Sequence, residues 1–348
     1  MASEMDPRKK HILKVITDDY IASAEPVGSR TIARRYSLGL SPATIRNEMA
    51  DLEESGYLEQ PHTSAGRVPS EQGYRYYVDA LMSLYQMTDL EIERIHFELD
   101  QRHQEIETVI HKTARILADM TQYPSLVLGP QLQTAIFRHI QLVKLEETTV
   151  LVLIVTDTGY VENKVITLDR EISATELDAL SGLLNQKLRG VCLRDLHATL
   201  LNDIRAEMVD RDHFFQETMK LLTKAISNRA NERIFVDGAT KILEQPEFNE
   251  LHKFKPLLSL LEEEDRLYKL LTRQFSREAQ VKIGRENQEL GINDCSVVTA
   301  GYEIGGRTVG VIGVLGPTRM DYAKVMPIVE YTAAILSEFL TNFNKRHR

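Results

Sequence analysis

The chain has little cysteine, no tryptophan and no long apolar run. Only Cys192 and Cys295 occur in its 348 residues. Two thiols are too few for a disulfide framework or a four-thiolate metal site, which favours a reducing compartment. The opening residues, MASEMDPRKK, lack the apolar core of a signal peptide. No stretch approaches the ~18 uninterrupted apolar residues of a membrane span. We therefore expect a cytoplasmic protein.

An excess of positive charge is also missing. The chain has 51 acidic and 42 basic residues, a formal net charge of −9. Proteins that bind nucleic acid usually show a basic footprint, so the total charge taken alone argues against such a partner. With 43% hydrophobic residues the chain can bury substantial cores. At roughly 100–200 residues per domain, its length predicts two or three domains.

The first 80 residues carry the start and stop signals of three short helices, followed by a β-loop. Asp6 and Ser41 are typical N-cap residues, and each precedes a proline suited to the first helical turn. Ser29 can cap the helix between them, and Gly56 can end the third helix as a C-cap. The predicted elements are a helix to Ile21, helices over Arg30–Tyr36 and from Pro42, a strand over Tyr57–Gln60, a loop over Pro61–Arg67 and a return strand. This order is typical of a winged helix-turn-helix.

The third predicted helix turns an apolar stripe of Ile45, Met49 and Leu52 toward the core, so other side chains point outward. Arginine can bind guanine O6 and N7, asparagine can bind adenine N6 and N7, and small methyl-bearing side chains can contact the thymine methyl. The outward set lies in the N-terminal half of the helix, the part that a recognition helix inserts into the major groove. The predicted base-reading residues are Ala43, Thr44, Arg46 and Asn47.

Residues that flank this helix are predicted to contact the DNA backbone. Free N–H groups and hydroxyls at a helix N-terminus suit phosphates, and an arginine in the β-loop suits a phosphate or the minor groove. The predicted backbone contacts are Ser29, Arg30, Thr31, Ser41, His62 and Arg67. Residues 26–50 have four arginines against one glutamate, a local net charge of +3. The alternative is a small helical bundle whose outward polar residues are merely solvated.

Beyond residue 88 the chain alternates helical and strand-like segments. Residues Asp89–Met120 predict a long helix with a heptad-like seam, interrupted by Arg102 and Thr113. This seam can pack on a sheet of its own chain or form an intermolecular coiled coil. Strand patterns follow, then mostly helices over about 171–275 with one strand at RIFVDGA, and then strands before a final helix. Strands that flank a helical block predict an α+β domain with another domain inserted into it.

Two motifs suggest chemistry, but a structural interpretation suits each better. GYEIGGRT, Gly301–Thr308, is one letter from a P-loop, yet β-type alternation continues beyond it, so its two adjacent glycines predict a hairpin turn. His103, Glu107 and His111 share a helix face, but His103 and His111 lie about 12 Å apart, too far for one metal ion. We predict no catalytic site, no metal and no cofactor, and therefore no enzyme.

Two long segments resemble a known family. The first is GSRTIARRYSLGLSPATIRNEMADLEESGYLEQPHTSAGRVPSEQGYRYYVD, Gly28–Asp79, and the second comprises VKIGREN and CSVVTAGYEIGGRTVGVIGVLGPTRMDY, ending at Tyr322. Both are similar to signature stretches of the HrcA family of heat-inducible transcription repressors. The resemblance implies a bacterial repressor of the chaperone operons that encode the DnaK machine and the GroES–GroEL chaperonin. It also implies a homodimer on an inverted-repeat CIRCE operator in double-stranded DNA, with the chaperonin GroEL as modulator.

The resemblance further implies how the chain is divided into domains. A winged-helix DNA-binding domain would occupy residues 1–88, and a discontinuous GAF-like domain residues 89–170 and 276–348. A dimerising domain would be inserted at residues 171–275. Two other functions remain open at this point. One is a ligand-gated regulator with a small molecule in the GAF-like domain. The other is a protein-interaction module whose helix-turn-helix serves as a scaffold.

Overall fold

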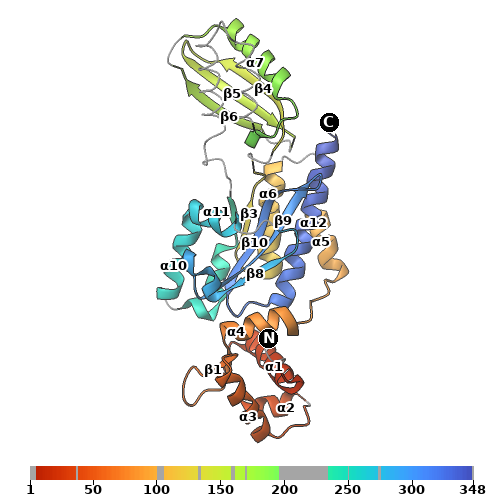
Figure 1. The fold of residues 1–348 in the computed structure, drawn as a ribbon, viewed down its shortest axis with the longest axis vertical. Helices are drawn as coiled ribbons and strands as arrows, with labels where there is room; N and C mark the ends of the chain where they lie inside the picture. The colour runs from red at the N-terminus through yellow and green to blue at the C-terminus, as the bar shows by residue number, and fades with distance from the viewer. Residues whose placement is uncertain are drawn as a thin grey trace.

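The protein is elongated and consists of three packing units along one axis, as the computed structural model shows (Figure 1). The structure describes residues 5–36, 38–99, 106–131, 135–157, 161–168, 171–195, 234–249, 251–272 and 276–346. We call the described residues within 5–81 the N-terminal unit, those within 135–195 the distal unit, and those within 82–131 and 234–346 the central unit. The central unit lies between the other two (Figure 1).

The N-terminal unit contains the helices and the β-loop that the sequence predicts. Its elements are α1 (Pro7–Ser23), α2 (Ser29–Arg35), α3 (Pro42–Glu54), β1 (Leu58–Glu59), β2 (Val68–Pro69), α4 (Glu71–Tyr76) and the π-helix η1 (Tyr77–Leu81). The Asp6 side chain caps α1 by accepting a hydrogen bond from the Arg8 N–H. One prediction was wrong in detail: Ser29 is the first residue of α2, and Gly28 is its N-cap. The extended backbone at Gly28 lets the helix begin one residue earlier.

The core of this unit is aliphatic and joins its first three helices. It contains Ile12, Leu13, Val15, Ile16, Val27, Ile32, Ile45, Met49, Leu52 and Leu58. The three core residues predicted on α3 are all buried, which confirms which face of α3 turns outward. Helix α3 ends as predicted near Gly56, which has a φ of +80° just after the C-cap Ser55. The Tyr57 N–H donates to the Leu52 carbonyl there, the pattern of a Schellman motif.

The central unit is built on a five-stranded antiparallel sheet of order β7-β3-β10-β9-β8. Its strands are β3 (Ser125–Leu128), β7 (Ile234–Asp237), β8 (Gln280–Ile283), β9 (Cys295–Ile304) and β10 (Arg307–Pro317). The adjacent glycines Gly305 and Gly306 both have positive φ and join β9 to β10. This confirms the predicted hairpin turn, because a type I′ turn needs that conformation at both positions.

Helices cover both faces of the central sheet. The helical elements of this unit are α5 (Asp89–Leu99), α6 (Ile106–Thr121), α10 (Leu251–Glu262), α11 (Glu264–Thr272), α12 (Tyr322–Arg346), η5 (Ala239–Glu244), η6 (Pro246–Asn249) and η7 (Gly284–Leu290). Helices α5, α6 and α12 pack on one face, and α10 and α11 on the other. Ile95, Val109 and Ile116 of the heptad-like seam are buried in this unit's own core. Their side chains are therefore unavailable for an intermolecular coiled coil. Arg102 lies outside the described residues.

The distal unit is a separate three-stranded sheet of order β4-β5-β6, packed on one helix. Its elements are β4 (Phe137–Lys144), β5 (Thr149–Thr156), β6 (Val161–Thr167), α7 (Ala174–Leu188) and the 3₁₀ helix η3 (Leu193–Asp195). The predicted domain boundaries place these strands in the GAF-like domain. They place β7, α10 and α11 in the inserted domain. In the structure β4–β6 share no sheet with β3, whereas β7 pairs with β3.

The described chain is thus a mixed α+β protein with several sheets, as predicted. The distal and central units are linked by an ion pair between Arg307 of β10 and Asp157, and by a hydrogen bond from Arg138 to Asn344 at 2.7 Å. Among the described residues, no helix combines the length and apolar character needed to cross a membrane.

Candidate nucleic-acid interface

The start of α3 is held by its own side chains. The Ser41 hydroxyl accepts a hydrogen bond from the Thr44 N–H at 3.1 Å and lies 2.9 Å from the Thr44 hydroxyl. Pro42 occupies the first turn, where its missing N–H has no helical partner to lose. Two predicted contacts, Ser41 and Thr44, therefore help to fix the helix N-terminus, and Thr44 is half-buried.

The exposed face of α3 carries the other predicted base readers. Ala43, Arg46 and Asn47 are all exposed. Within the described part of the chain, neither Arg46 nor Asn47 has a hydrogen bond or ion pair to another side chain. The Arg46 guanidinium and the Asn47 amide therefore keep their donors and acceptors available to an outside partner. We call Ala43, Arg46 and Asn47 the α3 face.

Two acidic residues of α3 are paired with basic residues of α1. Glu48 lies 3.4 Å from Arg8 and Asp51 lies 2.8 Å from Lys9, both on α1. The carboxylate of Asp51 is also the main cause that raises the Lys9 pKa above its ordinary value. These pairs offset the negative charge of Glu48 and Asp51, whereas the Arg46 charge on the α3 face has no ion pair to a described residue.

Helix α2 carries two neighbouring arginines, Arg34 and Arg35, that differ in their partners. Arg35 donates to Asp19 at 2.7 Å, and the Tyr36 hydroxyl donates to the same carboxylate at 3.2 Å. Burial, with the negative charge of Asp19, raises the Tyr36 pKa. By contrast, Arg34 is exposed and has no ion pair with the described residues. The sequence alone predicts no separate role for Arg34, because only the contact with Asp19 distinguishes Arg35 from it.

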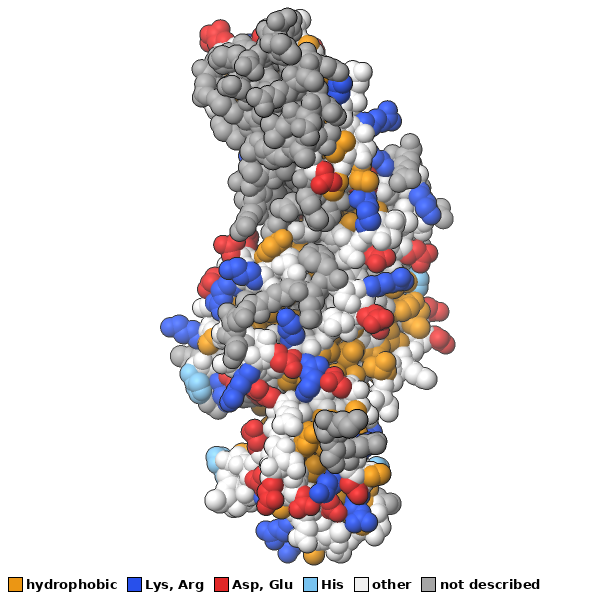
Figure 2. Space-filling view, viewed as in Figure 1, with side chains coloured by type: hydrophobic (Ala, Val, Ile, Leu, Met, Phe, Trp, Pro, Cys, Tyr) orange, Lys and Arg blue, Asp and Glu red, His pale blue; other side chains and the backbone are white. Residues whose placement is uncertain are grey.

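The predicted contacts at the start of α2 are accessible to different degrees. Arg30 is exposed, while Ser29 and Thr31 are half-buried in the first turn of the helix. Arg30 also has no ion pair within the described residues. With Arg34 and Arg46, it leaves three unpaired arginines on α2 and α3. Basic side chains accordingly reach the lower end of the molecule in Figure 2, where Figure 1 places these helices.

The β1–β2 loop exposes one of its two predicted contacts and engages the other. His62 is exposed near the loop tip, where its carbonyl accepts the Ala65 N–H at 2.9 Å. Arg67 instead turns back to α3: its Nε lies 2.9 Å and its second guanidinium nitrogen 2.7 Å from one Glu53 oxygen. Arg67 also exchanges two backbone hydrogen bonds with Val27. Arg67 therefore holds the β1–β2 loop to α3 and does not lie on the α3 face.

Metal and thiol chemistry find little support in the described residues. No group of three or more His, Cys, Asp or Glu side chains there could hold a metal ion. His103 lies outside those residues, and the His111 ring packs edge-on against Phe235. Burial raises the pKa of the Cys295 thiol to about 12, so this thiol is protonated at neutral pH and a poor nucleophile.

Comparison with known proteins places the chain in a family. The model described as "HrcA protein C terminal domain" matches residues 107–326. A heat-inducible transcription repressor HrcA from Pelotomaculum thermopropionicum is 44% identical over 97% of each chain. Another from Brevibacillus brevis is 45% identical over 97% of this chain and 98% of the relative. The chain belongs to the HrcA family. The family consists of transcription repressors and not of enzymes, in agreement with both predictions.

The fold is also shared with a solved structure. A crystal structure described as that of a hypothetical protein at 2.2 Å resolution superposes with a TM-score of 0.64. It is 23% identical and covers 97% of this chain and 99% of the other. At this identity the likeness extends to the fold alone.

Proposed function

We propose that the chain is a heat-shock transcription repressor that binds double-stranded DNA through the N-terminal unit, a winged helix-turn-helix. The observation that carries this proposal is the α3 face, where an arginine and an asparagine lie exposed on a well-capped helix, with no side-chain partner in the described part of the chain. Arg46 reads guanine and Asn47 reads adenine in the major groove, and Ala43 contacts a thymine methyl. Thr44, which is half-buried, lies at the margin of this surface.

Residues around the α3 face contact phosphates and so set affinity more than specificity. Arg30 and Arg34 supply free positive charge, and Ser29 and Thr31 present hydroxyls beside the first-turn N–H groups of α2. His62 lies at the tip of the β-loop, which serves as the wing. The acidic remainder of the chain limits nonspecific attachment, because it adds no phosphate contacts and repels the DNA backbone.

The operator is an inverted repeat of the CIRCE type upstream of chaperone operons, read by a homodimer in the bacterial cytoplasm. The distal unit forms the dimer, with the central unit as a GAF-like body. Support comes from the sheet β4–β6, which packs α7 on one face and presents aliphatic side chains on the other. Of these, Val161 and Val165 are 52% and 59% exposed. Exposed apolar groups on one face mark interaction surfaces.

The chaperonin GroEL modulates repression by keeping the repressor competent, so heat relieves repression when chaperonin is diverted to unfolded clients. The test is a gel shift with an inverted-repeat duplex from a chaperone operon and a scrambled duplex of the same composition. The assay is run at two temperatures with and without chaperonin. We expect selective retardation of the inverted repeat, strengthened by chaperonin after heating. Equal retardation of both duplexes would contradict sequence-specific repression.

A further inference from the structure

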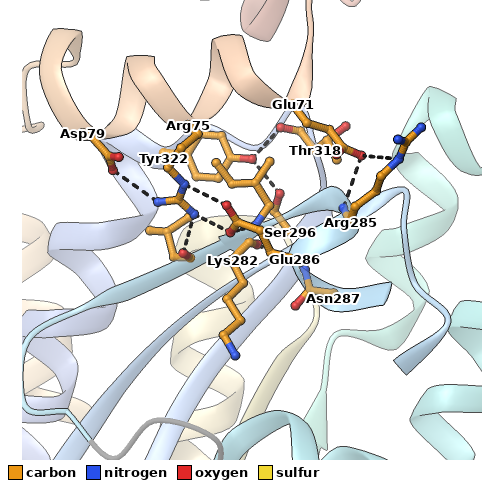
Figure 3. Close-up of polar contacts among 12 residues, drawn as sticks. Glu71, Arg75, Asp79, Lys282, Arg285, Glu286, Asn287, Ser296, Thr318 and Tyr322 are labelled. Carbon is orange, nitrogen blue, oxygen red and sulfur yellow. Dashed lines mark hydrogen bonds and ion pairs between the residues drawn. The ribbon is translucent and has the colours of Figure 1, made fainter. Parts of the chain in front are cut away.

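The segment Gly73–Asp79, GYRYYVD, belongs to the family-like stretch of the sequence but lies outside the α3 face. It forms α4 and η1, a helical segment that joins the N-terminal unit to the central unit. Figure 3 shows this segment lying over the strands and loops of the central unit, with Arg75 pointing toward Glu286. Its side chains therefore have a role other than contact with DNA.

Successive aromatic residues of this segment pack into two different cores. Tyr74 is 2% exposed, lies in the core of the central unit and packs edge-on against Tyr322, with ring centroids 6.1 Å apart. Tyr76 packs edge-on against Tyr57 of the N-terminal unit at 5.5 Å. Gly73 lets α4 approach the β-loop closely, because a Cβ there would lie 2.1 Å from the Tyr57 carbonyl oxygen. The segment is thus held by both units at once.

Arg75 supplies a charged anchor between these units. Its Nε donates to one Glu286 oxygen at 2.9 Å, and a terminal nitrogen donates to the other at 2.5 Å. That nitrogen also donates to the Val281 carbonyl at 2.7 Å, and the remaining nitrogen donates to Asp79 at 3.2 Å. A two-pronged arginine–carboxylate contact fixes direction as well as distance. Arg75 therefore resists rotation of α4 against the central unit.

Arg319 forms a second anchor on the other side of the junction. It is 9% exposed and donates to the Ile21 carbonyl at the end of α1 at 2.6 Å. Its Nε donates to Glu247 of η6 at 2.5 Å, and another nitrogen donates to Gln245 at 3.3 Å. One guanidinium thus joins the N-terminal unit to two segments of the central unit. Two anchors at separate points prevent a swivel that either would permit alone.

We propose that Arg75 and Arg319 form a clamp that sets the direction in which α3 points from the body of the repressor. They are positioning residues that do not touch DNA, and their role rests on the proposed dimeric function. In a dimer the second half-site is bound at an effective concentration that depends on how well the two reading helices match its distance and direction. The clamp makes the repressor selective for one spacing between the operator half-sites.

The DNA test uses Arg75→Gln and Glu286→Gln, with Arg285→Gln as the matched control. Arg285 lies beside the same junction, but its side chain is 80% exposed and 3.9 Å from Glu71. Affinity is measured for a single half-site and for inverted repeats with spacers changed by one or two base pairs. Clamp variants should bind the half-site within about twofold of wild type but lose about tenfold on the preferred spacing. Their preference among spacers should flatten, whereas Arg285→Gln should keep the wild-type profile. An unchanged spacer profile in the clamp variants would overturn the proposal.

A distance measurement separates failure of the clamp from failure of the proposed function. Spin labels are placed at the exposed residues His11 and Glu330, as His11→Cys and Glu330→Cys in a Cys192→Ser background. The labelled full chain is diluted with unlabelled protein, so that only distances within one chain are read. Wild type should give one narrow distribution, and Arg75→Gln and Glu286→Gln a broad one. Equally narrow distributions would refute the clamp even if wild type proved indifferent to inverted-repeat DNA.

Discussion

The arginines of the α3 face and of the clamp are the same residue type in opposite states. Arg46 is exposed and has no ion pair among the described residues, whereas Arg319 is 9% exposed and donates to three residues. The first can offer its guanidinium to a base. The second donates four hydrogen bonds within this chain. An arginine therefore reports recognition or architecture only once its partners are known.

Arg67 and Arg35 show that sequence position does not decide between these states. Both lie within the segment whose sequence predicts DNA binding. Arg67 nevertheless forms an ion pair with Glu53, and Arg35 forms one with Asp19. The local net charge of +3 over residues 26–50 is unchanged when the paired residues Arg35 and Glu48 are left out. Arg35 and Glu48 both have partners on α1, which leaves Arg30, Arg34 and Arg46 with no ion pair to a described residue. Substitutions can distinguish a group that is free to bind an outside partner from one that is engaged within the chain.

The largest effect on stability is expected at the most buried engaged arginine. Arg319→Met removes the cation from Glu247, whose side chain is only 22% exposed, and leaves the Ile21 carbonyl without its donor. Loss of one partner of such a pair costs about 3 kcal/mol of the free energy of unfolding. Chemical denaturation measures this change. Arg285→Gln, at an exposed position, should change the value by less than about 0.5 kcal/mol.

A smaller effect is expected at Arg67, where the two classes give opposite predictions. Arg67→Gln should lower the free energy of unfolding by about 1 kcal/mol, because it removes a half-buried ion pair between the β-loop and α3. If Arg67 is engaged, the salt dependence of DNA binding should stay as in wild type. A fall of about one in the salt slope would instead make Arg67 a phosphate contact.

The Cys295 thiol is another group whose chemistry depends on its surroundings. Burial raises its pKa from 9.0 to about 12. The folded state therefore favours the neutral thiol. This contribution to stability is complete below pH 9, the pKa in the unfolded chain, and is lost as the pH rises toward 12. At pH 10 the unfolding free energy should therefore be lower by about 1 kcal/mol than at pH 7 through this group. Urea unfolding of wild type and Cys295→Ala at both pH values, in reductant, isolates the contribution. An equal pH dependence in both proteins would contradict the assignment.

The smallest effect is expected at Tyr74, whose buried hydroxyl has no hydrogen-bond partner among the residues that the structure describes. Tyr74→Phe keeps the ring against Tyr322 and removes an unsatisfied polar group, so it should stabilise the protein by up to about 1 kcal/mol. Thermal unfolding measures the shift. Destabilisation would mean that the hydroxyl does take part in holding the junction.

Local features of the N-terminal and central units could be predicted from the sequence because their causes are local. Capping at Asp6 and Ser41, the hairpin at Gly305-Gly306 and the apolar stripe of α3 depend on residues within a few positions of one another. The outward face of α3 followed from that stripe. Its prediction as a set of base readers remains to be tested.

The clamp and the distal unit could not be predicted in the same way. Arg75 and Glu286 are 211 residues apart, and no spacing rule connects them. Likewise, strand alternation over 137–167 identifies strands but not the sheet to which they belong, and in the structure these strands form a sheet of their own. Helix α7 decides this grouping by burying one face of β4–β6.

The most direct test of the account compares Arg46→Ala and Asn47→Ala on operator and scrambled duplexes across salt concentrations. Each variant should lose about 1–3 kcal/mol of binding free energy on the operator and much less on the scrambled duplex. Arg30→Ala, at a proposed phosphate contact, should instead weaken binding to both duplexes alike and reduce the salt slope by about one. Equal losses of Arg46→Ala and Asn47→Ala on the two duplexes would contradict the claim that α3 reads the sequence.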